Sequence, residues 1–169
     1  MTTEPVLKGK AFKFGDDIST DLIIAGKYAH LRSNLPELAK HAMEDANPDF
    51  IKQVKPGDFI VGGSNFGLGS SREHAPLVIK MAGVSAILAK SFARIFFRNA
   101  INQGVPALIC DTDKISGGDT LEINLEEGLI NNVSRQETYH FTRIPKAMLS
   151  ILNEGGLIPY INKHGDFRL

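Results

Sequence analysis

Cysteine is nearly absent from this sequence: Cys110 is the single one among 169 residues. One cysteine excludes an internal disulfide, and it cannot supply the three or four thiolates that hold an iron–sulfur cluster. A cofactor of that kind would have to be bound by another chain.

Net charge and long apolar runs are also lacking. The 19 basic and 19 acidic side chains cancel, which excludes a whole-protein field that attracts nucleic acid or an anionic membrane. The longest apolar runs, such as 105–110, fall far short of the roughly 20 residues that span a bilayer. Residues 1–10 have no apolar core typical of a signal peptide. We therefore expect a cytoplasmic protein in which any anion site is local.

The pattern of apolar residues predicts an α/β fold. The length fits one domain over residues 1–169, without internal repeats. Predicted strands and helices alternate between residues 59 and 109, which favours parallel strands in a mixed sheet core with flanking helices. The predicted strands are 9–14, 59–61, 86–89, 105–109 and a hairpin of 120–125 and 129–133; the predicted helices are 36–44, 73–81, 92–101 and 145–153; residues 27–34 are predicted to be an exposed loop.

The strongest local feature is the segment GLGSSRE at residues 67–73, between a predicted strand and a predicted helix. Its glycines let the backbone approach a ligand closely, and free amides at a helix start attract anions. Arg72 can bind a carboxylate through two parallel hydrogen bonds. Ser70 or Ser71 could then act at a reacting carbon, provided that amide donors and positive charge stabilise its alkoxide.

The same segment has a structural alternative. Ser70 could cap the following helix, with Ser71 and Arg72 in the first turn and Glu73 completing a capping box. Capping boxes are much commoner than active sites, but two glycines and an arginine in one turn favour a ligand site. The segment lacks the endings of a phosphate-binding P-loop and of a dinucleotide-binding motif.

Two other segments are ambiguous by themselves. The cluster DDISTD at residues 16–21 could orient a basic side chain or a substrate hydroxyl, although a solvated turn is the simpler explanation. It lacks the glycine and the late glutamate of a calcium-binding EF-hand loop. Arg32 follows in the predicted loop, and a lone surface arginine is usually solvated.

Taken together, three segments resemble the swivelling domain of the aconitase superfamily. They are GDDISTDLI at 15–23, NFGLGSSREHA at 65–75 and KSFARIFFRN at 90–99. Their order and spacing resemble the stand-alone small subunits of the isopropylmalate isomerase and homoaconitase type, over nearly the whole chain. The resemblance implies a single β/β/α swivelling domain without a metal of its own. It also implies a large partner subunit that binds a 4Fe-4S cluster through three cysteines.

The resemblance further implies roles for matching residues. Ser70 resembles the catalytic base, which removes a proton from the carbon next to a carboxylate, and Asp21 is implied as a second catalytic residue. Ser71, Arg72 and Thr20 resemble substrate ligands. The implied reaction dehydrates a 2-hydroxy di- or tricarboxylate and rehydrates it in the opposite sense, with the partner's iron as Lewis acid.

The segment 90–99 carries no predicted chemistry. Phe92, Ile95 and Phe96 are predicted to lie in the core. Arg94 and Arg98 are predicted to hold the loop or the partner subunit.

The substrate depends on a segment that, in relatives, discriminates a distal carboxylate from an isopropyl group. Here it reads YAHLRS at 28–33, one residue longer than the common tyrosine-leucine-arginine form. A buried arginine facing an isopropyl group would cost several kcal/mol. Arg32, predicted as a substrate ligand, therefore favours a polar substrate if its side chain points inward.

Three hypotheses stay open. The leading one is the small subunit of a 3-isopropylmalate dehydratase in leucine biosynthesis, active only with its large subunit. The alternative is the small subunit of a homoaconitase or of another substituted-malate dehydratase, such as one for 2,3-dimethylmalate. A hypothesis of a different class is a carboxylate-binding module that uses the loop at 67–73 as an anion nest. A neighbouring gene for a protein of about 400 residues with cluster-binding cysteines would favour an enzyme over this module.

Overall fold

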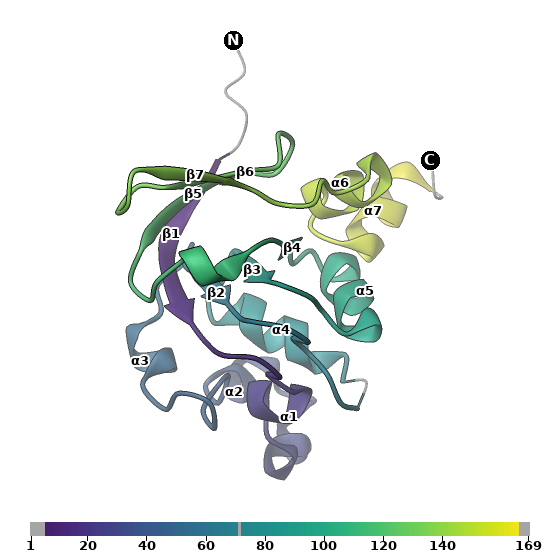
Figure 1. Ribbon diagram of the computed structural model, residues 1–169. Helices are drawn as coiled ribbons and strands as arrows, with labels where there is room; N and C mark the ends of the chain where they lie inside the picture. The colour runs from purple at the N-terminus through teal and green to yellow at the C-terminus, as the bar shows by residue number, and fades with distance from the viewer. Residues whose placement is uncertain (1–5, 71, 166–169) are drawn as a thin grey trace.

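Seven strands form one sheet in the order β4-β3-β2-β1-β5-β6-β7 (Figure 1). The computed structural model describes residues 6–70 and 72–165. The strands are β1 Val6–Lys13, β2 Phe59–Val61, β3 Ala86–Ala89, β4 Ala107–Ile109, β5 Thr120–Asn124, β6 Leu129–Asn132 and β7 Glu137–His140. The helices are α1 Thr20–Ile23, α2 Leu35–Ala39, α3 Phe50–Gln53, α4 His74–Met81, α5 Arg94–Asn102, α6 Lys146–Asn153 and α7 Leu157–His164, with 3-10 helices η1 Gly26–Leu31 and η2 Thr112–Lys114.

The sheet has a parallel half and an antiparallel half that share β1. Strands β1 to β4 are parallel neighbours, whereas β5 pairs antiparallel with β1 and continues into β6 and β7. The sheet curves into a half-barrel with flanking helices (Figure 1). The predicted mixed sheet is therefore confirmed.

The helices follow from this topology. Each parallel strand is succeeded by its next neighbour in one direction along the sheet, so right-handed crossovers place the connecting helices on one face. Helix α4 contacts α2 and α5, and α6 and α7 pack against α5. Strands β2 and β3 are buried throughout, as expected of parallel strands between covered faces. In β5, buried residues alternate with partly exposed ones, so one face of the antiparallel half is less covered.

Two predicted segments differ from the structure. The predicted loop at 27–34 is largely a 3-10 helix, η1. The predicted helix at 36–44 ends at Ala39, because the chain turns back and Met43 takes a φ of 60°. There the Met43 amide donates to the Ile23 carbonyl at 2.8 Å, and the Met43 side chain is fully buried. Packing against α1 thus overrides the helical pattern.

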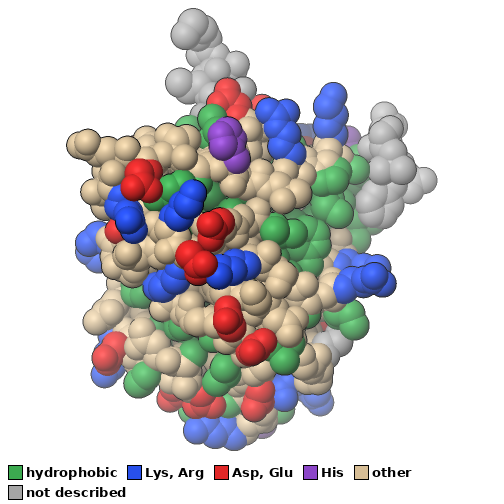
Figure 2. Space-filling view, viewed as in Figure 1, with side chains coloured by type: hydrophobic (Ala, Val, Ile, Leu, Met, Phe, Trp, Pro, Cys, Tyr) green, Lys and Arg blue, Asp and Glu red, His purple; other side chains and the backbone are tan. Residues whose placement is uncertain are grey.

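The surface carries both signs of charge. Figure 2 shows acidic and basic side chains intermixed on one face, with hydrophobic side chains gathered between the positions of α5 and α6. Within residues 6–70 and 72–165, no helix is long and apolar enough to cross a membrane.

Candidate active site

Three loops meet beyond the carboxyl ends of β1, β2 and β3. The loop after β2 bonds to the loop after β1 through Gly67 N to Ile18 O at 2.7 Å and Thr20 N to Leu68 O at 2.9 Å. It also bonds to the loop after β3, through Phe66 N to Ser91 O at 3.0 Å. Carboxyl ends of parallel strands are a common place for ligand sites in α/β folds. The three segments quoted above therefore lie side by side.

Gly67 sets the path of the loop after β2. Its φ of 85° lies in the left-handed region, which favours glycine. A Cβ at this position would overlap the ring of Phe96 on α5. The loop can therefore lie directly against α5 only because residue 67 has no side chain.

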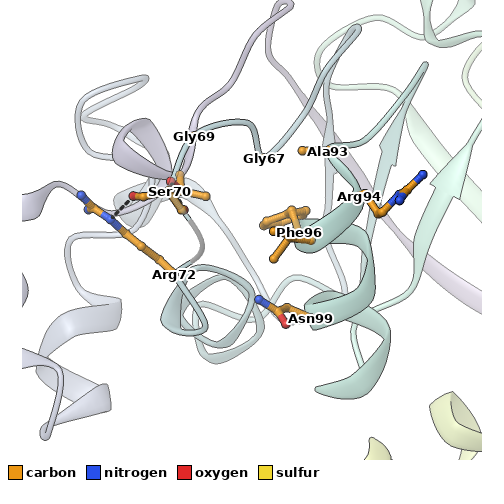
Figure 3. Close-up of a pocket in the computed structure, with 10 residues that line it drawn as sticks. Gly67, Gly69, Ser70, Arg72, Ala93, Arg94, Phe96 and Asn99 are labelled. Carbon is orange, nitrogen blue, oxygen red and sulfur yellow. Dashed lines mark hydrogen bonds between the residues drawn. The ribbon is translucent and has the colours of Figure 1, made fainter.

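Ser70 accepts hydrogen bonds through both its backbone carbonyl and its side-chain hydroxyl. The buried Thr20 hydroxyl donates to the Ser70 carbonyl at 3.0 Å. Arg72 Nε donates to Ser70 Oγ at 3.3 Å, which is the contact dashed in Figure 3. A guanidinium beside this hydroxyl stabilises its alkoxide form by charge and by hydrogen bonding.

Arg72 is itself positioned by the loop after β1. Its Nη1 donates to the Ile24 carbonyl at 2.8 Å and lies 3.2 Å from Asp21 Oδ1. Asp21 Oδ1 also accepts from the Gly26 amide at 3.1 Å. Asp21 therefore links the end of α1 to the guanidinium that contacts Ser70.

The helix-cap alternative for this segment is wrong. Helix α4 begins at His74, and its N-cap residue Glu73 makes no side-chain cap hydrogen bond. Ser70 precedes this helix by several residues, and its side chain accepts from Arg72 instead. Ser70 is free of a capping role in the helix that follows it.

Two hollows flank Arg72. The first, of about 290 Å³, contains the Ser70 side chain and is lined by Thr20, Gly67, Gly69, Ser70, Arg72, Ala93, Arg94, Ile95, Phe96 and Asn99. The second, of about 450 Å³, is lined by Ile24, Ala25, Gly26, Tyr28, Ala29, Arg32, Leu38, Arg72, Glu73 and His74. Arg72 thus connects the hollow that holds Ser70 with the one that Arg32 lines.

Comparison with known proteins decides the family. Residues 17–112 match the Aconitase C-terminal domain. This chain belongs to that family. A relative in Archaeoglobus fulgidus, named 3-isopropylmalate dehydratase small subunit 2, is 63% identical over 95% of this chain and 98% of its own length. One in Thermotoga maritima, named 3-isopropylmalate dehydratase small subunit 1, is 58% identical over 96% of this chain and 98% of its own.

A solved structure supports the same family assignment for the fold. The crystal structure titled 3-isopropylmalate dehydratase from Methanocaldococcus jannaschii has a TM-score of 0.92 and 45% sequence identity. The similarity covers 95% of this chain and 96% of that one. The β/β/α aconitase C-terminal fold predicted from the motifs is therefore confirmed.

Most of the predicted site residues converge in this aconitase C-terminal domain. Thr20, Asp21, Ser70 and Arg72 form one hydrogen-bonded group. Arg32 lines the adjacent hollow, in the turn that directly follows η1. Ser71 lies outside the described residues. The motifs did not single out Asn99 or His74 as site residues, although Asn99 ends the third quoted segment and lines the Ser70 hollow.

One core prediction in the third segment is wrong. Phe96 is buried and Phe92 is partly buried, packed against Phe66, as predicted. Ile95, however, is 53% exposed. Helix α5 turns it toward the Ser70 hollow because the adjacent Phe96 already occupies the face that meets the sheet.

The residues of this chain do not fit an iron–sulfur cluster. In the described parts of the chain there is no group of three or more His, Cys, Asp or Glu side chains placed to hold a metal ion. Burial raises the pKa of the Cys110 thiol to about 12, which disfavours the thiolate that metals bind. The three or four thiolates of a cluster cannot come from this chain, whose single cysteine is Cys110.

The 3-10 helix η1, which ends directly before Arg32, packs against the chain beyond α2. The rings of Tyr28 and His41 stack with centroids 3.8 Å apart and planes 15° apart. His41 Nδ1 lies 3.0 Å from Glu44 Oε2. A hydrogen bond between Tyr28 and Glu44 raises the pKa of Tyr28 and lowers that of Glu44. These three side chains, the Tyr28 anchor, fix η1 beside the second hollow.

Proposed function

We propose that this chain is the small subunit of a 3-isopropylmalate dehydratase, a hydro-lyase that acts with a large subunit. The observation that carries the proposal is the contact of Ser70 Oγ with Arg72 at 3.3 Å, within the group that also contains Thr20 and Asp21. Relatives that share 50–63% of their residues over at least 90% of this chain bear that small-subunit name or a closely related one. The name places the reaction in leucine biosynthesis.

Ser70 is the proposed base of the reaction. Its ionised Oγ takes the proton from the carbon next to a substrate carboxylate and holds it while hydroxide leaves the neighbouring carbon. The proton then returns to carbon as hydroxide adds in the opposite sense. Arg72 stabilises the ionised hydroxyl through its Nε and presents further donors to the substrate carboxylate. Thr20 fixes the Ser70 backbone, and Ser71 is assigned a second substrate contact by the resemblance alone.

Asp21 is the proposed positioning residue for Arg72. Its carboxylate pairs with Nη1 of Arg72, which leaves Nε of Arg72 to donate to Ser70. Without this partner the guanidinium would keep, among the described residues, only the Ile24 carbonyl and Ser70 as acceptors. We therefore assign Asp21 to catalysis through Arg72.

The partner completes the site in this proposal. The single cysteine of this chain cannot hold a cluster, so in this proposal a 4Fe-4S cluster would be bound by the large subunit, where it would supply activation of the leaving hydroxyl. A cytoplasmic location remains a prediction from the sequence.

A substrate with a polar distal group is the second candidate. Arg32 lines the hollow that Arg72 also lines, and among the described residues its side chain has no hydrogen bond or ion pair. Arg32 is exposed, so water can solvate it; a distal carboxylate, as in a homoaconitase, would give it a partner. A relative in Methanocaldococcus jannaschii, 50% identical over 94% of this chain, is named isopropylmalate/citramalate isomerase small subunit, so substrate range varies among such names.

The mechanism is tested on the complex reconstituted anaerobically with the large subunit of the same organism. Ser70→Ala should lower kcat at least about 100-fold with 3-isopropylmalate, the scale of a lost general base. Arg72→Lys should raise KM and lower kcat, since lysine cannot replace the planar guanidinium. Ser64→Ala, an exposed serine in the same loop, is the matched control and should match wild type. Near-normal turnover by Ser70→Ala would remove the proposed base.

The substrate is tested with a panel on the same complex. Preference for 3-isopropylmalate over homoaconitate supports the first candidate, whereas the reverse preference, lost in Arg32→Val, supports the second. Absence of turnover with every 2-hydroxy acid would favour a carboxylate-binding module.

A further inference from the structure

Helix α5 presents three exposed side chains between two hollows. Arg94, Ile95 and Arg98 lie one turn or less apart, and all three are exposed. We call these residues the α5 ridge. Ile95 lines the Ser70 hollow, whereas Arg98 lines a third hollow on the other side of the helix, and Arg94 lines both.

The charges of the α5 ridge are unmatched within the described chain. Neither Arg94 nor Arg98 has a side-chain hydrogen bond or ion pair there. The first turn of α5 contains no acidic residue. Arg94 therefore adds a cation to the positive end of a helix, where it is electrostatically unfavourable. An acidic surface against the ridge would relieve this repulsion.

The third hollow is apolar and adjoins the ridge. It measures about 550 Å³ and is lined by Arg94, Phe97, Arg98, Ile101, Asn102, Met148, Ile151 and Leu157. Figure 2 shows hydrophobic side chains gathered between the positions of α5 and α6. An apolar groove with arginines at its edge is typical of a protein-binding surface, where arginine is enriched and exposed hydrophobic area is concentrated.

The direction of Arg94 separates it from the substrate groups. In Figure 3, Arg94 points away from Ser70 and Arg72, which face each other on the opposite side of the hollow. A chain that completes the site at Ser70 has to come over the open side of this hollow, which Ile95 borders. The same chain then reaches the α5 ridge.

We propose that the α5 ridge and the adjoining groove bind the large subunit through an acidic segment that places an apolar side chain in the groove. This inference rests on the proposed function, which supplies the partner. The arginines pair with carboxylates of the segment, and Ile95 is buried in the contact. The interface thus lies directly beside the substrate pocket, so that docking and closure of the site are one event.

The test measures binding of the purified chain to the large subunit of the same organism by biolayer interferometry. Arg98→Glu should weaken binding about tenfold, and Arg94→Glu/Arg98→Glu by more, chiefly through slower association. The wild-type association rate should fall as salt rises, and the double variant should lose this dependence. Lys52→Glu, the same charge reversal on the distant helix α3, is the matched control and should bind like wild type.

Two further readouts separate the possible outcomes. Arg98 does not line the Ser70 hollow, so Arg98→Glu should regain wild-type kcat at saturating small subunit. Unchanged melting temperatures of the isolated variants show that folding is intact. If wild type binds and activates the large subunit but the ridge variants bind equally well, the docking surface is wrong. If wild type itself does not bind, the proposed function fails instead. A rise in KM for substrate without a change in subunit affinity would also overturn the proposal, by making Arg94 a substrate ligand.

Discussion

At the scale of single residues, Gly67 is the point where the site loop touches α5. Gly67→Ala should destabilise the fold by about 2–3 kcal/mol. Alanine is strained in the left-handed conformation of residue 67, and its Cβ would also overlap the side chain of Phe96. Gly118 is the matched control, since its φ is 90° but its added Cβ meets no atom within 4 Å. Gly118→Ala should cost about 1 kcal/mol, from strain alone. Urea unfolding measures both, and equal losses would mean that the loop moves away from Phe96 freely.

Cys110 should be inert toward thiol reagents while the chain is folded. Burial raises its pKa to about 12, so at pH 8 only about one thiol in ten thousand is ionised. An Ellman titration should therefore find no fast-reacting thiol in the native chain and one thiol in urea. Rapid reaction of the native chain would show that Cys110 is more accessible than the structure has it.

The site residues were predictable to different degrees. The glycine-rich turn singled out Ser70 and Arg72 locally, whereas only the resemblance of the three segments to the aconitase superfamily joined Thr20 to them; the structure brings the three together. Ile95 was assigned to the wrong face, since the run Ile-Phe-Phe at 95–97 fits a buried face in more than one rotation of the helix. Only contact with the sheet decides which of these residues is buried.

At the scale of elements, the Tyr28 anchor fixes η1 and with it the position of Arg32, the residue that follows this helix. We expect His41→Ala to raise KM about fivefold while kcat changes little. The variant loses the stacking contact that positions η1, and a loss of roughly 1 kcal/mol in substrate binding corresponds to this change in KM. Tyr28→Phe keeps the ring stack but removes the hydrogen bond to Glu44, so its effect should be smaller. His30→Ala, an exposed histidine on the same 3-10 helix, serves as the control. An equal fall in kcat and no change in KM for His41→Ala would contradict a positioning role.

The elements that sequence reasoning missed lack a local pattern. In β7 only Tyr139 is buried, so no alternation marks the strand. Helix α7 follows α6 after two glycines, which signalled an end but not a new start. By contrast, the buried strands β2 and β3 were predicted with their observed bounds, because fully apolar runs between turn residues are a strong signal.

At the scale of the whole molecule, the parallel and antiparallel halves of the sheet join around Asp119. Its carbonyl accepts from the Ala11 amide in β1 at 2.8 Å, and the residue directly precedes β5. Its carboxylate accepts from the Ser116 amide at 2.8 Å and from Asn132 in β6 at 2.9 Å. Asp119 thus forms hydrogen bonds with β1, with the turn at Ser116 and with β6, at the junction of the two halves of the sheet.

The Asp119 carboxylate at this junction should make the stability of the fold fall at acidic pH. Burial raises the pKa of Asp119, but the hydrogen bonds from Asn132 and Ser116 outweigh it, and the net pKa is lowered. The stability that Asp119 contributes is therefore present above about pH 4 and is lost as the pH falls through its lowered native pKa. The lowered pKa values of Glu37, Glu44, Asp113 and Glu154 act in the same direction.

Urea unfolding of Asp119→Asn between pH 3 and pH 7 tests the assignment. Asparagine keeps one acceptor oxygen but no charge, so the variant should be less stable than wild type by about 1 kcal/mol at pH 7. The difference should begin to shrink below about pH 4, where Asp119 of the unfolded wild type takes up a proton, and should vanish as the pH falls through the lowered native pKa. Glu126→Gln removes the same charge from an exposed turn. Its free energy of unfolding should fall below pH 4 as that of wild type does. A stability difference that stays constant down to pH 3 would mean that the hydrogen-bond geometry, and not the charge, holds the two halves of the sheet together.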